Sequence, residues 1–241
     1  MTDTKHMESI IASGLDQLLS RNCGEAVPAL LAEYGQALLE KNQVMNLTAI
    51  TDPTDVATLH MLDCAALLNC GDFSEKNLID VGSGAGFPGM VLQLLVPSLS
   101  VTVLDSLQKR LTWLDELAGN FGLPLRTVHG RAEEAGQDPS YREQFDLATA
   151  RAVADLRLLS ELCLPFVRVG GQFLAMKSAD SAAELDAAQT AIQTLGGEVT
   201  HLYDYTIPHT QVTHRIIVIE KRRPTPAVYP RRWAKMQKKP L

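Results

Sequence analysis

The sequence has 241 residues, is 46% hydrophobic and carries a formal net charge of −6. A chain of this length can bury one substantial core, so we expect one main domain rather than two small ones. Residues 1–6 are polar and no apolar run approaches the roughly 18 to 20 residues of a membrane span, which predicts a soluble, cytoplasmic protein with no membrane partner.

Helical periodicity dominates residues 1–70, where apolar residues recur in three groups at helical spacing. The stretch from Asn42 to Pro53, between the second and third groups, is too polar and proline-punctuated to be helical throughout. We therefore expect three or four helices, packed on the core as an N-terminal helical cap. The groups are Ile10, Leu15, Leu18 and Leu19; Ala29, Leu30, Tyr34, Leu38 and Leu39; and Val56, Leu59, Leu62, Ala65 and Ala66.

An alternation of strands and helices is expected in residues 71–220. It predicts a mainly parallel sheet covered on both faces. The last two strands are joined by Ile207 to Thr213, which leaves no room for a crossover helix and predicts an antiparallel hairpin. Six strands in one direction plus one reversed strand is typical of the Rossmann-like α/β fold of class I methyltransferases. The expected strands lie near residues 77–81, 100–104, 125–129, 145–150, 171–176, 198–205 and 214–220.

A glycine-rich loop follows the first expected strand, between Leu78 and Gly86. Glycines at 82, 84 and 86 let the backbone turn sharply and let a ligand approach it, and the run from Phe87 to Leu95 can supply a helix N-terminus. This pattern is typical of nucleotide-like cofactor sites. Residues 84–89 also match the dinucleotide fingerprint G-x-G-x-x-G, so an NAD-binding Rossmann protein is an alternative at this point.

Acidic residues at the strand ends favour S-adenosylmethionine over NAD. Asp80 precedes the first glycine by two positions, where a carboxylate repels a pyrophosphate but attracts ammonium and sulfonium groups. Asp105 ends the second strand, 19 residues after Gly86, near the spacing of about 20 at which a carboxylate accepts ribose hydroxyls. Glu133 and Glu134 follow the third strand and either meet an adenine edge or form a solvated helix start.

The fourth strand leads into Arg151, where the D/N-P-P-Y motif of adenine amino methyltransferases is absent. None of the four cysteines has the Pro-Cys context of a cytosine C5 nucleophile or the spacing of a zinc site, and we expect reduced, mostly buried thiols and no metal. Arg151, Lys177 and Arg215 remain as cationic candidates for the acceptor side. Each could equally be a cation at the core edge that a carboxylate satisfies.

Charge is distributed unevenly along the chain. Residues 221–241 hold eight of the 22 basic residues and no acid, which leaves 14 basic against 28 acidic residues, a net charge of −14, in residues 1–220. This asymmetry predicts a basic C-terminal tail that binds a polyanion. A solvated terminus kept soluble by its charge is the alternative. Because the last expected strand ends at residue 220, we expect the fold to survive deletion of the chain after Arg223.

Short motifs spread along the chain are Asn46–Thr48, His60–Asp63, Asp80–Gly89, Leu104–Ser106, Arg151–Val153, Tyr229–Arg231 and Lys238–Leu241. In this order they resemble the ribosomal RNA small subunit methyltransferase G family, also called glucose-inhibited division protein B. The resemblance runs from about residue 28 to the C-terminus. It departs from the family at Cys64, where serine is usual, and at Trp233 to Met236, which replace a stretch containing glycine and proline.

The resemblance implies a methyltransferase that uses S-adenosylmethionine to methylate N7 of one guanine in bacterial 16S ribosomal RNA, within an assembled small subunit. We expect the protein to be a monomer. Guanine N7 carries an exposed lone pair, so its attack on the methyl group requires no general base. The expected cofactor residues are Asp80, Gly82, Gly84, Gly86, Phe87, Asp105, Ser106, Ala132, Glu133 and Arg151. The residues expected at the reacting groups are Arg151, Asn46, His60 and Lys177, and those expected to bind RNA are Arg215, Arg231, Arg232, Lys238 and Lys239.

Asp63 lies three positions after His60 on an expected helix, and we hypothesise that it orients His60 toward the nucleotide. A surface pair of slight stabilising value is the alternative. Two other function classes stay open at this point. A small-molecule methyltransferase would use the same cofactor loop without needing a basic tail, and a non-enzymatic RNA-binding protein would need the tail but neither Asp80 nor Asp105.

Overall fold

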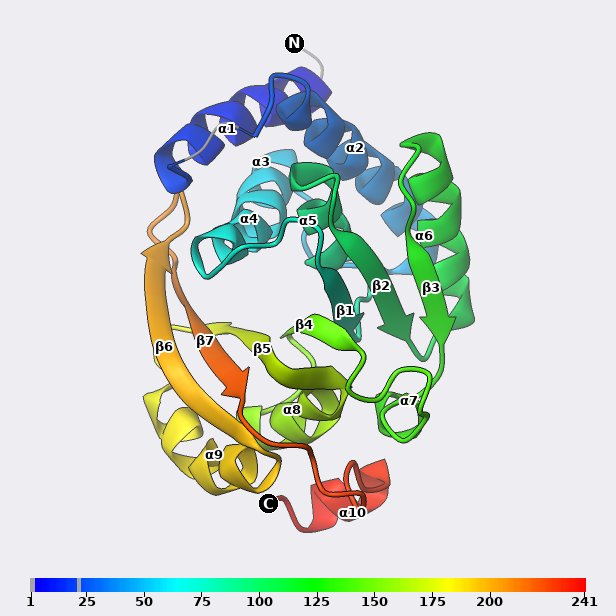
Figure 1. Cartoon of the computed structure of the whole chain (residues 1–241). Helices are drawn as coiled ribbons and strands as arrows, with labels where there is room; N and C mark the ends of the chain where they lie inside the picture. The colour runs from blue at the N-terminus through cyan, green and yellow to red at the C-terminus, as the bar shows by residue number, and fades with distance from the viewer. Residues whose placement is uncertain (1–2, 21–22) are drawn as a thin grey trace.

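The computed structural model describes residues 3–20 and 23–241 and is built around one seven-stranded sheet (Figure 1). The strand order is β3-β2-β1-β4-β5-β7-β6, and β7 runs antiparallel to both of its neighbours. The predicted arrangement of six strands in one direction plus one reversed strand is confirmed, as is the hairpin of β6 and β7. The strands are β1 (Asn77–Val81), β2 (Ser100–Asp105), β3 (Arg126–His129), β4 (Phe145–Arg151), β5 (Val167–Ser178), β6 (Gly197–Thr206) and β7 (Thr213–Lys221).

Both faces of the sheet are buried, and successive strand residues point to opposite faces. In β5, Leu174 and Met176 join one core cluster, whereas Phe173 and Ala175 join the other. The first cluster is covered by α1 (Asp3–Leu18), α2 (Val27–Met45), α5 (Gly89–Leu95) and α6 (Gln108–Asn120). The second is covered by α8 (Leu156–Cys163), α9 (Ala182–Thr194) and α10 (Trp233–Lys238), on the opposite side in Figure 1. Helices on both faces confirm the predicted fold class.

The third helix of the N-terminal cap is irregular. The chain passes through α3 (Pro53–Asp55), a π-helical segment η1 (Val56–Leu62), α4 (Asp63–Ala65) and a 3-10 turn η2 (Ala66–Asn69). The break before it is confirmed, because α2 ends at Met45 and α3 begins at Pro53. The Asp52 side chain accepts hydrogen bonds from the amides of Thr54 and Asp55 and so caps the new helix. The wider π-helical turn changes which side chains share a face, so helical spacing of three or four residues does not apply at His60.

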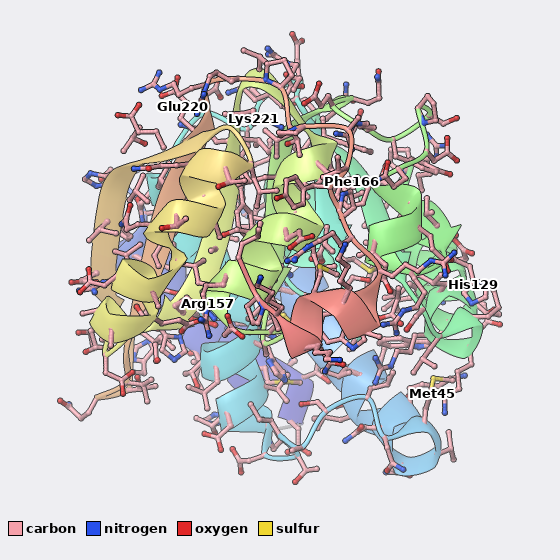
Figure 2. All side chains as sticks on the ribbon, turned by 90° about the horizontal axis from the view of Figure 1, so that it is seen from below. Met45, His129, Arg157, Phe166, Glu220 and Lys221 are labelled. Atoms are coloured by element: carbon pink, nitrogen blue, oxygen red, sulfur yellow. The ribbon has the colours of Figure 1, made fainter. Side chains whose placement is uncertain are left out.

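The C-terminal segment is packed on the second face of the sheet. Met236 in α10 is fully buried in the core cluster of that face. The Arg142 guanidinium donates hydrogen bonds to the carbonyl oxygens of Thr225 at 2.7 Å and Tyr229 at 2.7 Å. Figure 2 shows the segment crossing this face from Lys221 to α10. The segment is therefore not the solvated terminus that the sequence analysis offered as the alternative, because its apolar and carbonyl groups are satisfied by the core.

Two smaller expectations can be compared with the described residues. Cys64 and Cys163 are buried, whereas Cys23 and Cys70 are half-buried, so burial holds for only two of the four thiols. Among residues 3–20 and 23–241, no helix combines the length and the apolar character needed to cross a membrane.

Alpha-helix α7 (Ala132–Ala135) follows β3 and lies beside the carboxyl ends of the strands.

Candidate active site

A first cavity of about 250 Å³ opens where the carboxyl ends of β1, β2 and β3 meet. The strand order reverses between β1 and β4, and this crevice is where α/β folds of this kind bind ligands. We refer to it as the cofactor cavity. Its lining includes five of the residues predicted to hold the cofactor, namely Gly82, Asp105, Ser106, Ala132 and Glu133.

The glycine loop is fixed by backbone geometry. Gly82 has a φ of 73°, and a Cβ atom placed on it would lie 2.8 Å from Cγ2 of Val153. Asp105 holds the loop from the neighbouring strand, because its Oδ2 accepts a hydrogen bond from the Gly84 amide at 2.9 Å. Its Oδ1 accepts one from the Leu107 amide at 2.8 Å. Asp105 therefore shapes the cavity and also contributes a carboxylate to its lining.

Asp80 lies beneath the loop and is not among the residues that line the cofactor cavity. The side chain is fully buried, and its Oδ2 accepts a hydrogen bond from the Gly89 amide at 2.9 Å. Its Oδ1 is buried without a hydrogen-bond partner among the described residues. Burial raises the pKa of Asp80 to about 7, although the Gly89 amide and the Arg151 charge oppose this shift. The carboxylate is thus an acceptor with spare capacity, directly under the loop.

An aromatic stack connects the glycine loop to the helical cap. Phe87 stacks on Tyr34, with ring centroids 5.3 Å apart, and on His60, with centroids 4.5 Å apart. Cζ of Arg151 lies 5.0 Å from the centroid of the Phe87 ring. Phe87 is 5% exposed and does not appear in the lining of the cofactor cavity. Its ring therefore serves as a platform for His60 and Arg151.

Arg151 is held by three groups of the helical cap. Its Nη1 donates to the Leu59 carbonyl at 3.0 Å and to Oδ2 of Asp63 at 3.1 Å, and its Nη2 lies 2.8 Å from Nδ1 of His60. Because arginine only donates, Nδ1 of His60 accepts, and its Nε2 carries the proton that bonds Oγ1 of Thr48 at 2.9 Å. Burial, assisted by the Arg151 charge, lowers the pKa of His60 to about 3. His60 is neutral and cannot pair with a phosphate as a cation.

The Asp63 amide donates to the His60 carbonyl, but the Asp63 carboxylate makes no hydrogen bond to the His60 ring, so the hypothesis that it orients this ring directly is wrong. Besides Arg151, Asp63 binds the Tyr205 hydroxyl at 2.7 Å and Nδ1 of His214 at 2.7 Å through its Oδ1. The alternative of a surface pair is wrong too, because His60 is 7% and Asp63 is 1% exposed. Asp63 instead orients Arg151 and His214. Burial raises the pKa of Asp63, but the hydrogen bond from His214 and the Arg151 charge outweigh it and bring the pKa below its usual value.

A second cavity of about 260 Å³ lies at the carboxyl ends of β4 and β5 and the start of β7. We refer to it as the acceptor cavity. Lys177 lines it, donates to the Ala154 carbonyl at 2.9 Å and forms an ion pair with Glu184. Ala152, with a left-handed φ of 57°, also lines it. The lining consists of Asp63, Arg151, Ala152, Met176, Lys177, Ser178, Glu184 and His214.

His214, which the sequence interpretation missed, lines this cavity in place of the predicted Arg215. Arg215 binds Asp204 on the adjacent strand through two hydrogen bonds of 2.6 and 2.8 Å and is outside the cavity lining. The two residues point to opposite faces because side chains alternate along a strand. Ile216 to Ile219, which follow in β7, are all buried on both faces of the strand. The alternation of side chains therefore does not indicate from the sequence whether His214 or Arg215 faces the cavity.

Asn46 is the left-handed C-cap of α2, with a φ of 51°, a conformation that asparagine adopts more readily than most residues. Asn46 begins the loop that contains Thr48, whose hydroxyl is hydrogen-bonded to His60. Asn42 orders that segment: its Oδ1 accepts from the amides of Leu47 at 2.6 Å and Thr48 at 3.0 Å. The predicted role of Asn46 at the reacting groups stays a prediction.

The cations of the C-terminal segment fall into two groups. Lys221 is fully buried and pairs with Glu143 at 3.2 Å, and Arg231 holds the buried Glu161 with contacts of 2.8 and 2.6 Å. The Arg231 side chain is 11% exposed, which favours a structural role over RNA binding. Arg222 pairs with Glu198 and Glu220 at the surface, and Arg223 donates to the Gln193 carbonyl. Within the described chain, Arg232, Lys235, Lys238 and Lys239 are exposed and make no ion pair.

The reversed seventh strand and a cavity at the switch point of the sheet define a class I methyltransferase. A family model described as rRNA small subunit methyltransferase G matches residues 28–213. The chain is therefore a member of the rRNA small subunit methyltransferase G family, and the resemblance seen in its motifs is confirmed.

Individual relatives agree with this assignment. The chain is 46% identical over 213 residues to "Ribosomal RNA small subunit methyltransferase G" of Alkaliphilus metalliredigens (strain QYMF), covering 88% of this chain and 89% of that protein. It is 47% identical over 214 residues to the protein of the same name from Lactobacillus johnsonii, covering 87% and 90%. The crystal structure of TrmN from Thermus thermophilus has a TM-score of 0.51 at 23% identity, covers 66% of this chain and 48% of that chain, and is similar in fold alone.

Proposed function

We propose that this protein transfers a methyl group from S-adenosylmethionine to N7 of one guanine of 16S ribosomal RNA, as a cytoplasmic monomer acting on the assembled small subunit. The observation that carries the proposal is the arrangement of two cavities around the segment that follows β4. Val153 lines the cofactor cavity, whereas Arg151 and Ala152 line the acceptor cavity. A donor and an acceptor bound in these cavities would meet at this segment.

The residues around the cofactor cavity fit S-adenosylmethionine, which supplies a methyl group on a positively charged sulfur. Asp105 and Glu133 place carboxylates in the lining, where ribose hydroxyls and an adenine amino group can donate to them. The buried Oδ1 of Asp80 has no partner among the described residues, and a cationic group at the loop would compensate it. A cation at the loop favours ionisation of the Asp80 carboxyl, whereas an NAD pyrophosphate, as an anion, would disfavour it.

The side chains of the acceptor cavity are suited to hold a base. The Asp63 carboxylate in the lining is bonded to Arg151, Tyr205 and His214. His60, outside the lining, holds Arg151 through Nδ1 and contacts Thr48 through Nε2. Guanine N7 attacks through a lone pair without losing a proton, so residues that fix geometry are sufficient. Positioning of two reactants is worth up to roughly 7 to 11 kcal/mol in well-oriented cases. Arg151, fixed from three sides, would position the acceptor against the methyl group.

Docking of RNA would use exposed cations, because residues 1–220 carry a net charge of −14. Four cations of the C-terminal segment are exposed and make no ion pair with described residues: Arg232, Lys235, Lys238 and Lys239. They would neutralise phosphates next to the cofactor cavity, which Trp233 of the same segment also lines. The target guanine has to leave its stack, which costs on the order of a few kcal/mol and least in a single-stranded loop.

The test supplies methyl-tritiated S-adenosylmethionine to the protein together with small subunits that lack this modification, free 16S RNA, or a mixture of small metabolites. We expect label in 16S RNA from the subunit, at one guanine whose strand is cleaved by reduction followed by aniline, the chemistry specific to N7-methylguanine. Label in a small metabolite alone would support a small-molecule methyltransferase instead. Calorimetric titration with the cofactor separates both outcomes from a non-enzymatic RNA-binding protein, which would release no heat of cofactor binding.

A further inference from the structure

Trp233, the first residue of α10, lines the cofactor cavity although it lies 82 residues beyond Arg151, the last predicted cofactor residue. Its half-buried indole shares the lining with Asp105, Glu133 and Leu162. Two of the motifs that resemble the family, Tyr229–Arg231 and Lys238–Leu241, flank this residue. Trp233 lies between them, in the stretch where this chain departs from the family. The departure therefore puts a large aromatic side chain into the wall of the cavity.

The position of Trp233 is fixed from both sides by buried contacts. Before it, the Arg231 amide donates to Oε1 of Glu161 at 2.8 Å, and Nε2 of Gln137 donates to the Pro230 carbonyl at 2.9 Å. After it, Met236 is fully buried in the core. Glu161 immediately precedes Leu162, which lines the same cavity, so α8 anchors the segment next to the cavity wall.

The indole of Trp233 lies next to one ion pair, Arg131 with Glu133, and its surroundings suit a planar ligand such as a purine. The Arg131 guanidinium lies over the ring, with Cζ 5.9 Å from its centroid, and pairs with Glu133 at 3.3 Å. Arg131, Ala132 and Glu133 together form the part of the lining that follows β3, where the adenine edge is expected. Tryptophan has a large apolar surface and a π-system on which a purine stacks favourably.

We propose that Trp233 belongs to the cofactor site and that its indole contacts the adenine end of bound S-adenosylmethionine. This rests on the proposed function, which places S-adenosylmethionine in the cofactor cavity. The C-terminal segment then has two separate tasks: its exposed cations face the RNA, and its tryptophan completes the wall of the nucleoside pocket. Loss of the indole weakens cofactor binding even where the fold and the loop of Gly82 are intact.

Calorimetric titration with S-adenosylhomocysteine compares the parental chain with Trp233→Ala, Trp233→Phe and Val228→Ala. Val228 is a matched control, because it is apolar, 68% exposed and in the same segment but outside the cofactor cavity. We expect Trp233→Ala to raise Kd by about tenfold, Trp233→Phe to retain most of the affinity, and Val228→Ala to leave Kd unchanged. Parental affinity in Trp233→Ala, with an unchanged melting temperature, would overturn the proposal.

Fluorescence provides a second readout, because the chain has two tryptophans and Trp113 is 5% exposed and outside the cavity lining. In Trp113→Phe, Trp233 is the single indole, and S-adenosylhomocysteine should change its emission with a midpoint equal to the calorimetric Kd. Binding without any change in emission contradicts a contact. If Trp113→Phe does not fold, the calorimetric comparison of the Trp233 variants, in which Trp113 is unchanged, tests the contact on its own. A parental chain that binds no S-adenosylhomocysteine would overturn the proposed function and the role of Trp233 together, whereas binding that ignores Trp233 overturns only the latter.

Discussion

The cofactor cavity and the acceptor cavity differ in how their charged groups are held. In the cofactor cavity, Asp105 is bonded to backbone amides of its own loop and of the glycine loop. The ion pairs there, Arg110 with Asp105 and Arg131 with Glu133, join residues that are close together in the sequence. In the acceptor cavity, charges are bonded to other charges: Arg151 to Asp63, Asp63 to His214, and Lys177 to Glu184. The first cavity is a local structure of the backbone, whereas the second is a network of side chains that depends on all of its members.

This difference predicts two kinds of mutant. A substitution in the cofactor cavity should weaken one ligand and leave the fold largely intact. A substitution in the network should leave a buried charge without its partner, so that activity and stability fall together.

The largest effect is expected for Arg151→Ala. The change removes the donors that bind the Leu59 carbonyl, His60 and Asp63, so methyl transfer to small subunits should fall on the order of 100- to 1000-fold. Asp63 would keep only Tyr205 and His214, and the free energy of unfolding should drop by about 3 kcal/mol. Single-turnover rates and urea unfolding measure the two effects. Arg151→Lys, which keeps the charge but not the forked geometry, should recover stability better than rate, and a parental rate in Arg151→Ala would show Arg151 to be structural only.

A comparison of two adjacent arginines tests whether the C-terminal segment is part of the fold. Arg231→Ala leaves Glu161, 1% exposed, without its cation and should cost about 3 kcal/mol of stability. Arg232→Ala changes an exposed side chain and should alter stability by less than about 0.5 kcal/mol. Its effect should lie in RNA binding, where the slope of log K against log salt should flatten by roughly 0.7 to 0.9 for each phosphate that is no longer neutralised. Equal melting temperatures for the two variants would restore the interpretation of a solvated terminus.

Asp105→Ala tests the local character of the cofactor cavity. It removes a carboxylate from the lining and two hydrogen bonds from the loop, so cofactor affinity should fall about 10- to 100-fold by calorimetry. Most of the effect should be on binding, since the strands stay intact, and circular dichroism should match the parental spectrum. Asp105→Asn retains one acceptor oxygen, and its Kd for the cofactor should lie between those of the parental chain and Asp105→Ala. An unchanged Kd would remove Asp105 from the site.

The smallest effect is a pH dependence of stability at His214. The hydrogen bond to Asp63 raises the pKa of His214, so the pair stabilises the fold fully below the ordinary histidine pKa of about 6.5 and less as the pH rises through the raised value. Asp63, whose pKa is lowered, loses its contribution only as the pH falls below about 4. Because His214 is 30% exposed, the contribution should be under about 1 kcal/mol. Urea unfolding at pH 5.5, 7.0 and 8.5 should show the gap between the parental chain and His214→Gln shrinking with pH; a constant gap would exclude a charged His214.

The sequence alone determined the seven strands, the reversed hairpin and the glycine loop. These features are encoded in short windows: the apolar runs of buried strands, the short connection before β7, and glycines where φ is positive. The cofactor cavity follows from the same windows, because Gly82, Asp105 and Glu133 lie at the ends of successive parallel strands, which a parallel sheet brings to one edge.

Only the tertiary structure decided which charges are free. Arg231 is bound to a glutamate 70 positions away, Asp63 to a histidine 151 positions away, and Arg215 turns from the cavity that its neighbour His214 lines. The π-helical turn likewise replaced the helical spacing on which the pairing of His60 with Asp63 was based. The energy of a charged side chain depends on burial and on partners that folding brings from distant segments, and neither is present in a local pattern of residues.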